Sequence, residues 1–129
     1  MPLLVAMLAV AWLPAAWSQA GDYPPAGDGQ TLIVASFNIR AFSDRTRDDA
    51  ELRDIAQLII PFDLVAIQET RDTLILERLV RLLGAEFGQE YHFAASPKLK
   101  SGGGELYAWV WRATRLQALG EPLLLDDPA

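Results

Sequence analysis

Strand-length apolar runs and amphipathic stretches alternate through residues 31–87, and this alternation constrains the fold more than any other feature of the sequence. The runs 31–38 (TLIVASFN) and 62–69 (FDLVAIQE) are almost entirely apolar, as in strands that are buried on both faces. The stretch that follows the turn-prone Ser43 and Asp44 and runs to Ile60, and the stretch 73–87, carry apolar residues at helical spacing, and Pro61 ends the first of them. A strand, helix, strand order predicts that the two strands pair in parallel through a right-handed crossover.

Two further strands are predicted, at Tyr91–Ala95 and Glu105–Arg112. In the second, ELYAWVWR, aliphatic and aromatic residues alternate, so neither face of the strand suits water. Residues 116–125 offer at most one or two more strands and no third helix. We therefore expect an α/β fold in which one mixed sheet carries two helices on one face, and in which nothing covers the other face.

The amino terminus has the pattern of a signal peptide. Residues 1–20 contain no charged side chain, and their apolar run, Leu3–Trp17, is shorter than the roughly 20 residues that a membrane-spanning helix needs. Small residues close the run, which predicts cleavage after Ala20. We expect a secreted or periplasmic protein without a stable membrane anchor.

The composition limits the remaining possibilities. Residues 21–30 (GDYPPAGDGQ) are rich in Gly, Pro and Asp and are predicted to be a linker, which leaves 31–129 as one domain. The chain has no cysteine, so packing rather than disulfides must stabilise it. Its formal net charge of -6 argues against a protein that coats nucleic acid. An enzyme that meets phosphate through a divalent cation is compatible with this charge, because the ion reverses the sign of the site.

Polar residues stand at the ends of the two strands that are predicted to be parallel. Asn38 ends the first and Glu69 ends the second, and ligands of open α/β sheets bind at this edge. A carboxylate beside an amide oxygen suits Mg²⁺. The spacing by itself is equally compatible with a turn at Asn38 and a solvated strand end at Glu69.

The amino-acid identities within the motifs carry more information than their spacing. SFNIR (residues 36–40), IQET (67–70) with the Arg71-Asp72 pair, a Tyr-His strand start at Tyr91 and the strand 105–112 follow one another in a fixed order. This series resembles the endonuclease/exonuclease/phosphatase superfamily, and within it the deoxyribonuclease I-like branch. The resemblance extends over roughly 31–127. It implies one half of a four-layer αββα sandwich, the amino-terminal one.

The resemblance also implies roles for individual residues. Glu69 would be a ligand of the catalytic Mg²⁺, with Mn²⁺ and Ca²⁺ as alternatives, and Asn38 would support the metal or the scissile phosphate. Glu105 would be a catalytic-site residue that orients a histidine. The alternative for Glu105 is an exposed strand start without a functional role.

Several basic residues match positions that contact nucleic acid in this branch. Arg40 and Arg71 would meet the DNA backbone and minor groove, and Lys100 would meet phosphate. The alternative for Arg71 is a salt bridge with Asp72 or Glu69. Gly103 departs from the branch, which has a tyrosine there for stacking in the minor groove, and this weakens the case for double-stranded DNA.

The single histidine, His92, matches no catalytic position of the superfamily, and we expect a structural histidine. The catalytic histidines and the remaining metal ligands would belong to a second half that follows Ala129. The sequence therefore predicts the amino-terminal portion of an exported, Mg²⁺-dependent phosphodiesterase, an endonuclease acting on nucleic acid with DNA favoured. Without its carboxy-terminal half-domain it would be inactive. The alternatives are a phosphatase or sphingomyelinase-type member of the superfamily, and a non-catalytic module that binds metal or a partner protein.

Overall fold

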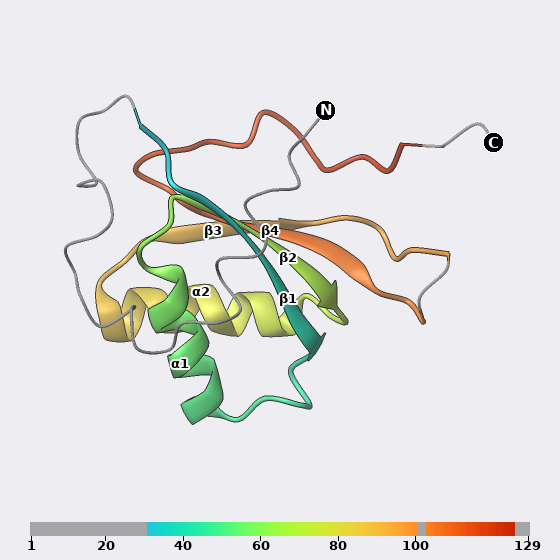
Figure 1. Cartoon of the computed structure of the whole chain (residues 1–129), viewed down its shortest axis with the longest axis horizontal. Helices are drawn as coiled ribbons and strands as arrows, with labels where there is room; N and C mark the ends of the chain where they lie inside the picture. Colours follow the sequence, from blue (N-terminus) through green and yellow to red (C-terminus); the bar gives the residue numbers. More distant parts are fainter. Residues whose placement is uncertain (1–30, 101–102, 126–129) are drawn as a thin grey trace. The chain divides into compact units, whose positions relative to one another are not determined.

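The computed structural model describes residues 31–100 and 103–125 (Figure 1). The predicted signal peptide, its cleavage site and the linker lie outside these residues. The chain divides into a unit of Met1–Thr31 and a unit of Leu32–Ala129, and the fold is that of the second unit. Its elements, in chain order, are β1 (Val34–Phe42), α1 (Asp49–Ile59), β2 (Leu64–Thr70), α2 (Leu74–Phe87), β3 (Tyr91–Ala95) and β4 (Leu106–Arg112).

The strands form one mixed sheet in the order β1-β2-β4-β3, with both helices on the same side of it (Figure 1). The pairing of β1 with β2 is parallel, as predicted, whereas β4 is antiparallel to β2 and to β3. The predicted α/β fold with one mixed sheet and two helices is therefore confirmed. β1 begins and ends later than the predicted 31–38, because its pairing with β2 continues past a bulge to Phe42.

Both helices are limited by local hydrogen bonds. α1 begins at Asp49 rather than directly after Asp44, because Asp48 forms a capping box with Glu51: the Glu51 amide donates to Asp48 Oδ1 over 2.9 Å, and the Asp48 amide donates to Glu51 Oε2 over 3.3 Å. α2 ends at Gly88, whose φ of 61° is the left-handed conformation that glycine adopts most readily.

The hydrophobic core lies between the helices and one face of the sheet. Leu52 and Ile59 of α1 and Leu79 and Leu83 of α2 are fully buried, and Val65 of β2 faces them from the sheet. Burying side chains of this size stabilises the fold by about 1.5 to 3 kcal/mol each. This layer holds the ends of β1 and β2 in fixed positions.

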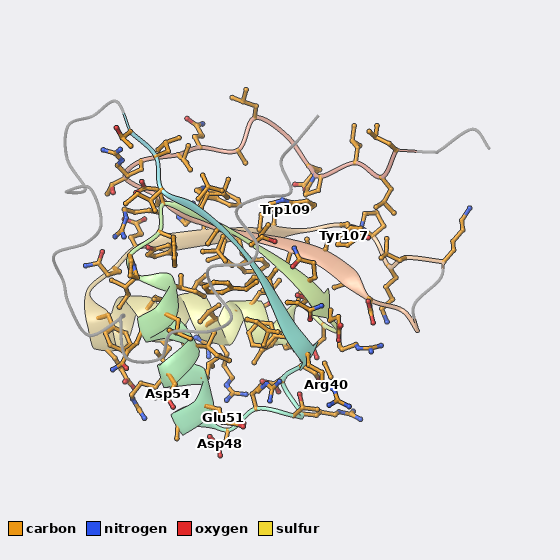
Figure 2. All side chains as sticks on the ribbon, viewed as in Figure 1. Arg40, Asp48, Glu51, Asp54, Tyr107 and Trp109 are labelled. Carbon is orange, nitrogen blue, oxygen red and sulfur yellow. The ribbon has the colours of Figure 1, made fainter. Side chains whose placement is uncertain are left out.

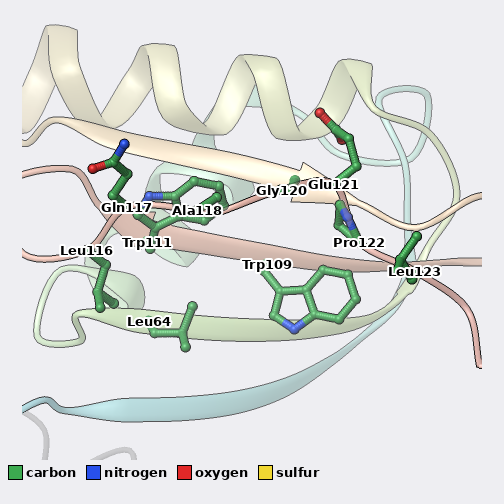
Figure 3. Close-up of a pocket in the computed structure, with 11 residues that line it drawn as sticks. Leu64, Trp109, Trp111, Leu116, Gln117, Ala118, Gly120, Glu121, Pro122 and Leu123 are labelled. Carbon is green, nitrogen blue, oxygen red and sulfur yellow. The ribbon is translucent and has the colours of Figure 1, made fainter.

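The opposite face of the sheet is covered in part. Trp109 and Trp111 lie there beside Leu64, and residues 116–123 pass over them and leave a groove of about 360 Å³ (Figure 3). The prediction that nothing in the chain covers this face was therefore wrong. The segment forms no strand, in part because Pro122 lacks the N–H that a ladder requires. It leaves other apolar side chains of the face open to solvent, Val34 at 59% exposure and Tyr107 at 44%.

Within residues 31–100 and 103–125, no helix combines the length and the apolar character needed to cross a bilayer.

Candidate functional site

The site begins at a bulge where β1 and β2 end. Asn38 pairs with Gln68, and the next pair in register is Phe42 with Thr70, so three residues of β1 stand opposite Glu69 alone. The register of β2 against β4 also shifts at this point. Bulges near strand ends commonly redirect a side chain, and this one directs the carboxylate of Glu69 toward β1.

The backbone of the bulge is strained. Glu69 has a φ of 59° and Ala41 has a φ of 48°, values that cost residues other than glycine about 1 to 3 kcal/mol each. The Oγ1 of Thr70 is buried and has no hydrogen-bond partner among the described residues. The Arg71 amide donates to the Phe42 carbonyl over 2.8 Å, and this hydrogen bond joins the ends of β1 and β2 beyond the bulge. Strain that the surrounding structure retains is a feature of functional sites.

Two donors from β1 hold the carboxylate of Glu69. Asn38 Nδ2 donates to Oε1 over 3.0 Å, and the Ala41 amide donates to Oε2 over 3.3 Å. These hydrogen bonds, with smaller contributions from the positive charges of Arg71 and Arg40, lower the pKa of Glu69. Glu69 is therefore a fixed, ionised carboxylate at neutral pH, and the predicted proximity of Asn38 and Glu69 is found.

Arg71 pairs with Glu105, and its charge also acts on Glu69. Its Nη2 lies 3.1 Å from Glu105 Oε1, and its Nη1 donates to the Gly103 carbonyl over 3.2 Å. Strands β2 and β4 are neighbours here, which brings together two residues that are distant in sequence. Arg71 thus forms a salt bridge, and the partner in this bridge is Glu105, which the sequence did not suggest.

Asp72 instead anchors the chain that follows β1. It accepts hydrogen bonds from the amides of Asp44, over 3.1 Å, and of Ile75, over 2.9 Å. Burial opposes ionisation of Asp72, but hydrogen bonds from Ser43 and from these amides outweigh it and lower its pKa. Asp72 thereby caps α2 and holds the loop beside the bulge. We did not anticipate this positioning role, although an Asp before a helix is a recognisable capping signal.

The remaining predicted basic residues stand around the bulge and its neighbouring loop. Arg40 is exposed beside Glu69, and its carbonyl accepts a hydrogen bond from Arg47 Nη2 over 2.6 Å (Figure 2). Lys100 is exposed at the last described position before residues 101–102. His92 lies in register with Trp111 and therefore with the beginning of β2, at the opposite end of the sheet from Glu69.

The carboxylate and amide groups at the bulge could supply some, but not all, of the ligands of a hard divalent cation. No group of three or more His, Cys, Asp or Glu side chains that could hold a metal occurs within the described ranges. Mg²⁺, however, is commonly held by only one or two carboxylates together with waters and substrate phosphates. An ionised Glu69 supported by the Asn38 amide meets that requirement, and further ligands would have to come from substrate or from another polypeptide segment.

A second charged cluster lies at the other end of the sheet and was not foreseen. Asp63, which is 2% exposed, accepts a hydrogen bond from the Ile33 amide over 3.0 Å. Its Oδ1 lies 3.4 Å from Arg112 Nε and 3.7 Å from Arg115 Nε. An Asp directly before a strand gives no signal in the sequence that it will be buried.

Tyr91 and Arg112 complete this second cluster. The Tyr91 hydroxyl donates to the carbonyls of Phe62, over 2.7 Å, and Ile60, over 3.2 Å, and burial raises the pKa of Tyr91 to about 12. The Arg112 guanidinium lies 5.0 Å from the centre of the Tyr91 ring and donates to the Ile60 carbonyl and to Gln89 Oε1. Most polar atoms of the cluster are paired within it, although the buried Nε of Arg112 has only its ion pair with Asp63, so the cluster has the character of a structural network.

Comparison with known proteins bears on the first site. The chain is 30% identical over 95 residues to "Deoxyribonuclease-1" of Bos taurus. The aligned region covers 70% of this chain and 34% of that protein. It is 30% identical over 93 residues to "Deoxyribonuclease-1" of Rattus norvegicus, which covers 69% of this chain and 33% of the relative. The chain is a partial relative of deoxyribonuclease I. The predicted relationship to the deoxyribonuclease I-like branch is thus confirmed, although the chain spans only about a third of the length of these relatives. No family model matches the chain.

Proposed function

We propose that this chain contributes part of the active site of an exported phosphodiesterase that depends on a divalent metal, Mg²⁺ in the first place, and acts on nucleic acid with DNA favoured. The observation that carries the proposal is the ionised Glu69 carboxylate, fixed by Asn38 and the Ala41 amide in a strained bulge. The similarity to proteins named deoxyribonuclease-1 supports the choice of substrate.

The residues of the chain would divide the work between metal and phosphate. Glu69 would be a direct ligand, and Asn38 would keep its carboxylate in one orientation while facing the metal or the scissile phosphate itself. A metal bound there would neutralise phosphate charge and polarise the phosphorus centre. Arg40, Arg71 and Lys100 would bind the nucleic-acid backbone, and Glu105 would orient a catalytic histidine.

The histidine in question would come from a complementary segment, because His92 lies at the other end of the sheet. We propose that residues 31–129 are the amino-terminal half of the catalytic domain, that 1–20 are a signal peptide and that 21–30 are a linker. A carboxy-terminal half-domain would complete the metal site and the sheet packing. The exposed side chains of Val34 and Tyr107 on the second face support this requirement. The chain alone would hydrolyse no phosphodiester bond.

Metal binding at Glu69 is the direct test. Mn²⁺ added to the ¹⁵N-labelled full-length chain should broaden the amide resonances of residues 38–42 and 69–71 first, through its paramagnetism. Glu69→Gln should abolish this selective broadening. Glu86→Gln is the matched control, because it removes one charge from a carboxylate that is paired with Arg53 over 2.5 Å on the helices. Equal broadening in both variants would contradict the proposed metal site.

Catalysis requires a separate test. The full-length chain, in Mg²⁺ and with plasmid DNA, should show no cleavage by itself and should gain cleavage when a complementary half-domain of deoxyribonuclease I type is supplied. The Glu69→Gln chain should gain none. Cleavage by the chain alone that Glu69→Gln removes would show that the half-domain proposal is wrong.

A further inference from the structure

The guanidinium of Arg71 binds two groups of the same chain. Its Nη2 lies 3.1 Å from Glu105 Oε1, and its Nη1 donates to the Gly103 carbonyl over 3.2 Å. The side chains of Arg71 and Glu105 are 36% and 23% exposed, so solvent reaches both. Gly103 and Glu105 belong to the segment that leads into β4, whereas Arg71 directly follows β2.

The loop is shaped to receive this guanidinium. Gly103 has a φ of 73°, and a Cβ at this position would stand 3.0 Å from Arg71 Nη1. A side chain at residue 103 would therefore displace the guanidinium. On the other side of the loop, a Cβ at Gly104 would meet Lys98 Cδ at 3.9 Å. Arg71 and Lys98 thus lie along the same two-glycine turn, in a chain whose formal net charge is -6.

We propose that Arg71 and Glu105 form a phosphate-sensitive latch: a substrate phosphate competes with the Glu105 carboxylate for the Arg71 guanidinium. The proposal rests on the proposed function, because it concerns the substrate of the same site. A guanidinium presents its donors in a planar fork that matches carboxylate and phosphate alike. An exposed ion pair is weak enough to exchange with such a ligand, because its two charges are already well solvated.

The latch links substrate binding to the state of Glu105. While Arg71 holds Glu105, the carboxylate is turned toward β2 and its charge is compensated. When phosphate takes Arg71, Glu105 loses its cation and becomes available to orient another group. Arg71 is therefore a positioning residue for Glu105 as well as a phosphate ligand, and the two roles exclude each other in time.

The experiment uses the ¹⁵N-labelled full-length chain, without added metal, and inorganic phosphate as the probe at constant ionic strength. The readouts are the Arg71 side-chain Nε–Hε resonance and the backbone amides of residues 103–106. In the unaltered chain both should shift together and saturate. Glu105→Gln should tighten phosphate binding about two- to fivefold, which corresponds to the usual strength of an exposed ion pair. Arg71→Gln should abolish the shifts at residues 103–106.

Two controls keep the outcome specific. Glu86→Gln removes the same single charge far from the loop and should leave the phosphate affinity unchanged. Glu105→Asp keeps the charge but withdraws the carboxylate by one methylene, so it should give an intermediate affinity if Glu105→Gln does not fold. Equal affinities in the Glu105→Gln and Glu86→Gln chains, or phosphate shifts that bypass Arg71, would overturn the latch. Neither result would affect Mn²⁺ binding at Glu69, so a failed latch and a failed metal site remain distinguishable.

Discussion

The two ends of the sheet use the same kinds of side chain for opposite purposes. At the amino end of β2, Asp63 is 2% exposed and is surrounded by a backbone amide and two guanidinium groups. At the carboxyl end, Glu69 and Glu105 lie near the surface, beside a strained backbone and the positive charges of Arg71 and Arg40. The first arrangement uses its charges to fix the structure. The second keeps them accessible to a ligand, which is the organisation expected of an active site on a stable scaffold.

The largest difference between the two ends should appear in stability. Asp63→Ala removes a buried carboxylate from Arg112 and Arg115, whose side chains are only 15% and 18% exposed, and from the Ile33 amide, so it should lower the free energy of unfolding by about 3 to 5 kcal/mol. Glu105→Ala breaks an exposed pair and should cost less than about 1 kcal/mol. Urea denaturation of the full-length chain measures both. Similar losses for the two variants would remove the distinction between a structural and a functional end.

Tyr91→Phe should have a smaller effect at the structural end. It removes the hydroxyl that donates to the carbonyls of Phe62 and Ile60, and should cost about 1 to 2 kcal/mol. The pKa of Tyr91 is raised to about 12, so its contribution is fully present below the ordinary value of about 10 and is lost as the pH rises through 12. The stability difference between the two chains, measured by urea denaturation from pH 7 to 12, should therefore be constant up to about pH 10 and then shrink. A difference that grows with pH would contradict this assignment.

Gly103→Ala should have a moderate effect at the functional end. Residue 103 has a φ of 73°, and an alanine Cβ there would stand 3.0 Å from Arg71 Nη1, so the substitution should cost about 1 kcal/mol and push the guanidinium away from Glu105. Gly120→Ala is the matched control, because nothing lies within 4 Å of a Cβ there. Thermal unfolding compares the two variants. If Gly120→Ala proved the more damaging, the loop would not be shaped by Arg71.

The smallest effect concerns ionisation at the bulge. The pKa of Glu69 is lowered first by the Asn38 hydrogen bond, so Asn38→Ala should raise it toward the ordinary value while leaving the pKa of Glu86 unchanged. Since the folded pKa of Glu69 is the lower one, its small stabilising contribution is present above the unfolded pKa and is lost as the pH falls through the folded value. ¹³C NMR titration of the carboxylates provides the measurement. An unmoved Glu69 would mean that Asn38 does not hold it.

The sequence predicted the helices and strands and the proximity of Asn38 to Glu69, but not the backbone geometry of the site. Asn38 and Glu69 were expected together because parallel neighbouring strands end at the same edge. The bulge between them was not predictable, since its left-handed positions are Ala41 and Glu69 rather than glycines. Such conformations depend on tertiary contacts and leave no local sequence signal.

The contacts between residues far apart in the sequence were also not predictable. Arg71 had acidic residues beside it in sequence, yet its partner is Glu105, which depends on the pairing of β2 with β4. The segment over Trp109 and Trp111 was likewise missed, because irregular chain that follows a surface has no periodicity to detect. In both cases the information lies in long-range packing.

The strand order has a consequence for the biosynthesis of the chain. β4 lies between β2 and β3, although it follows both of them in the sequence. Until Arg112 has left the ribosome, β3 has no neighbouring strand and the sheet lacks one of its two inner strands, so native pairing of β3 must wait for β4. The described sheet is thus completed from its middle, by a strand that is made after both of its neighbours.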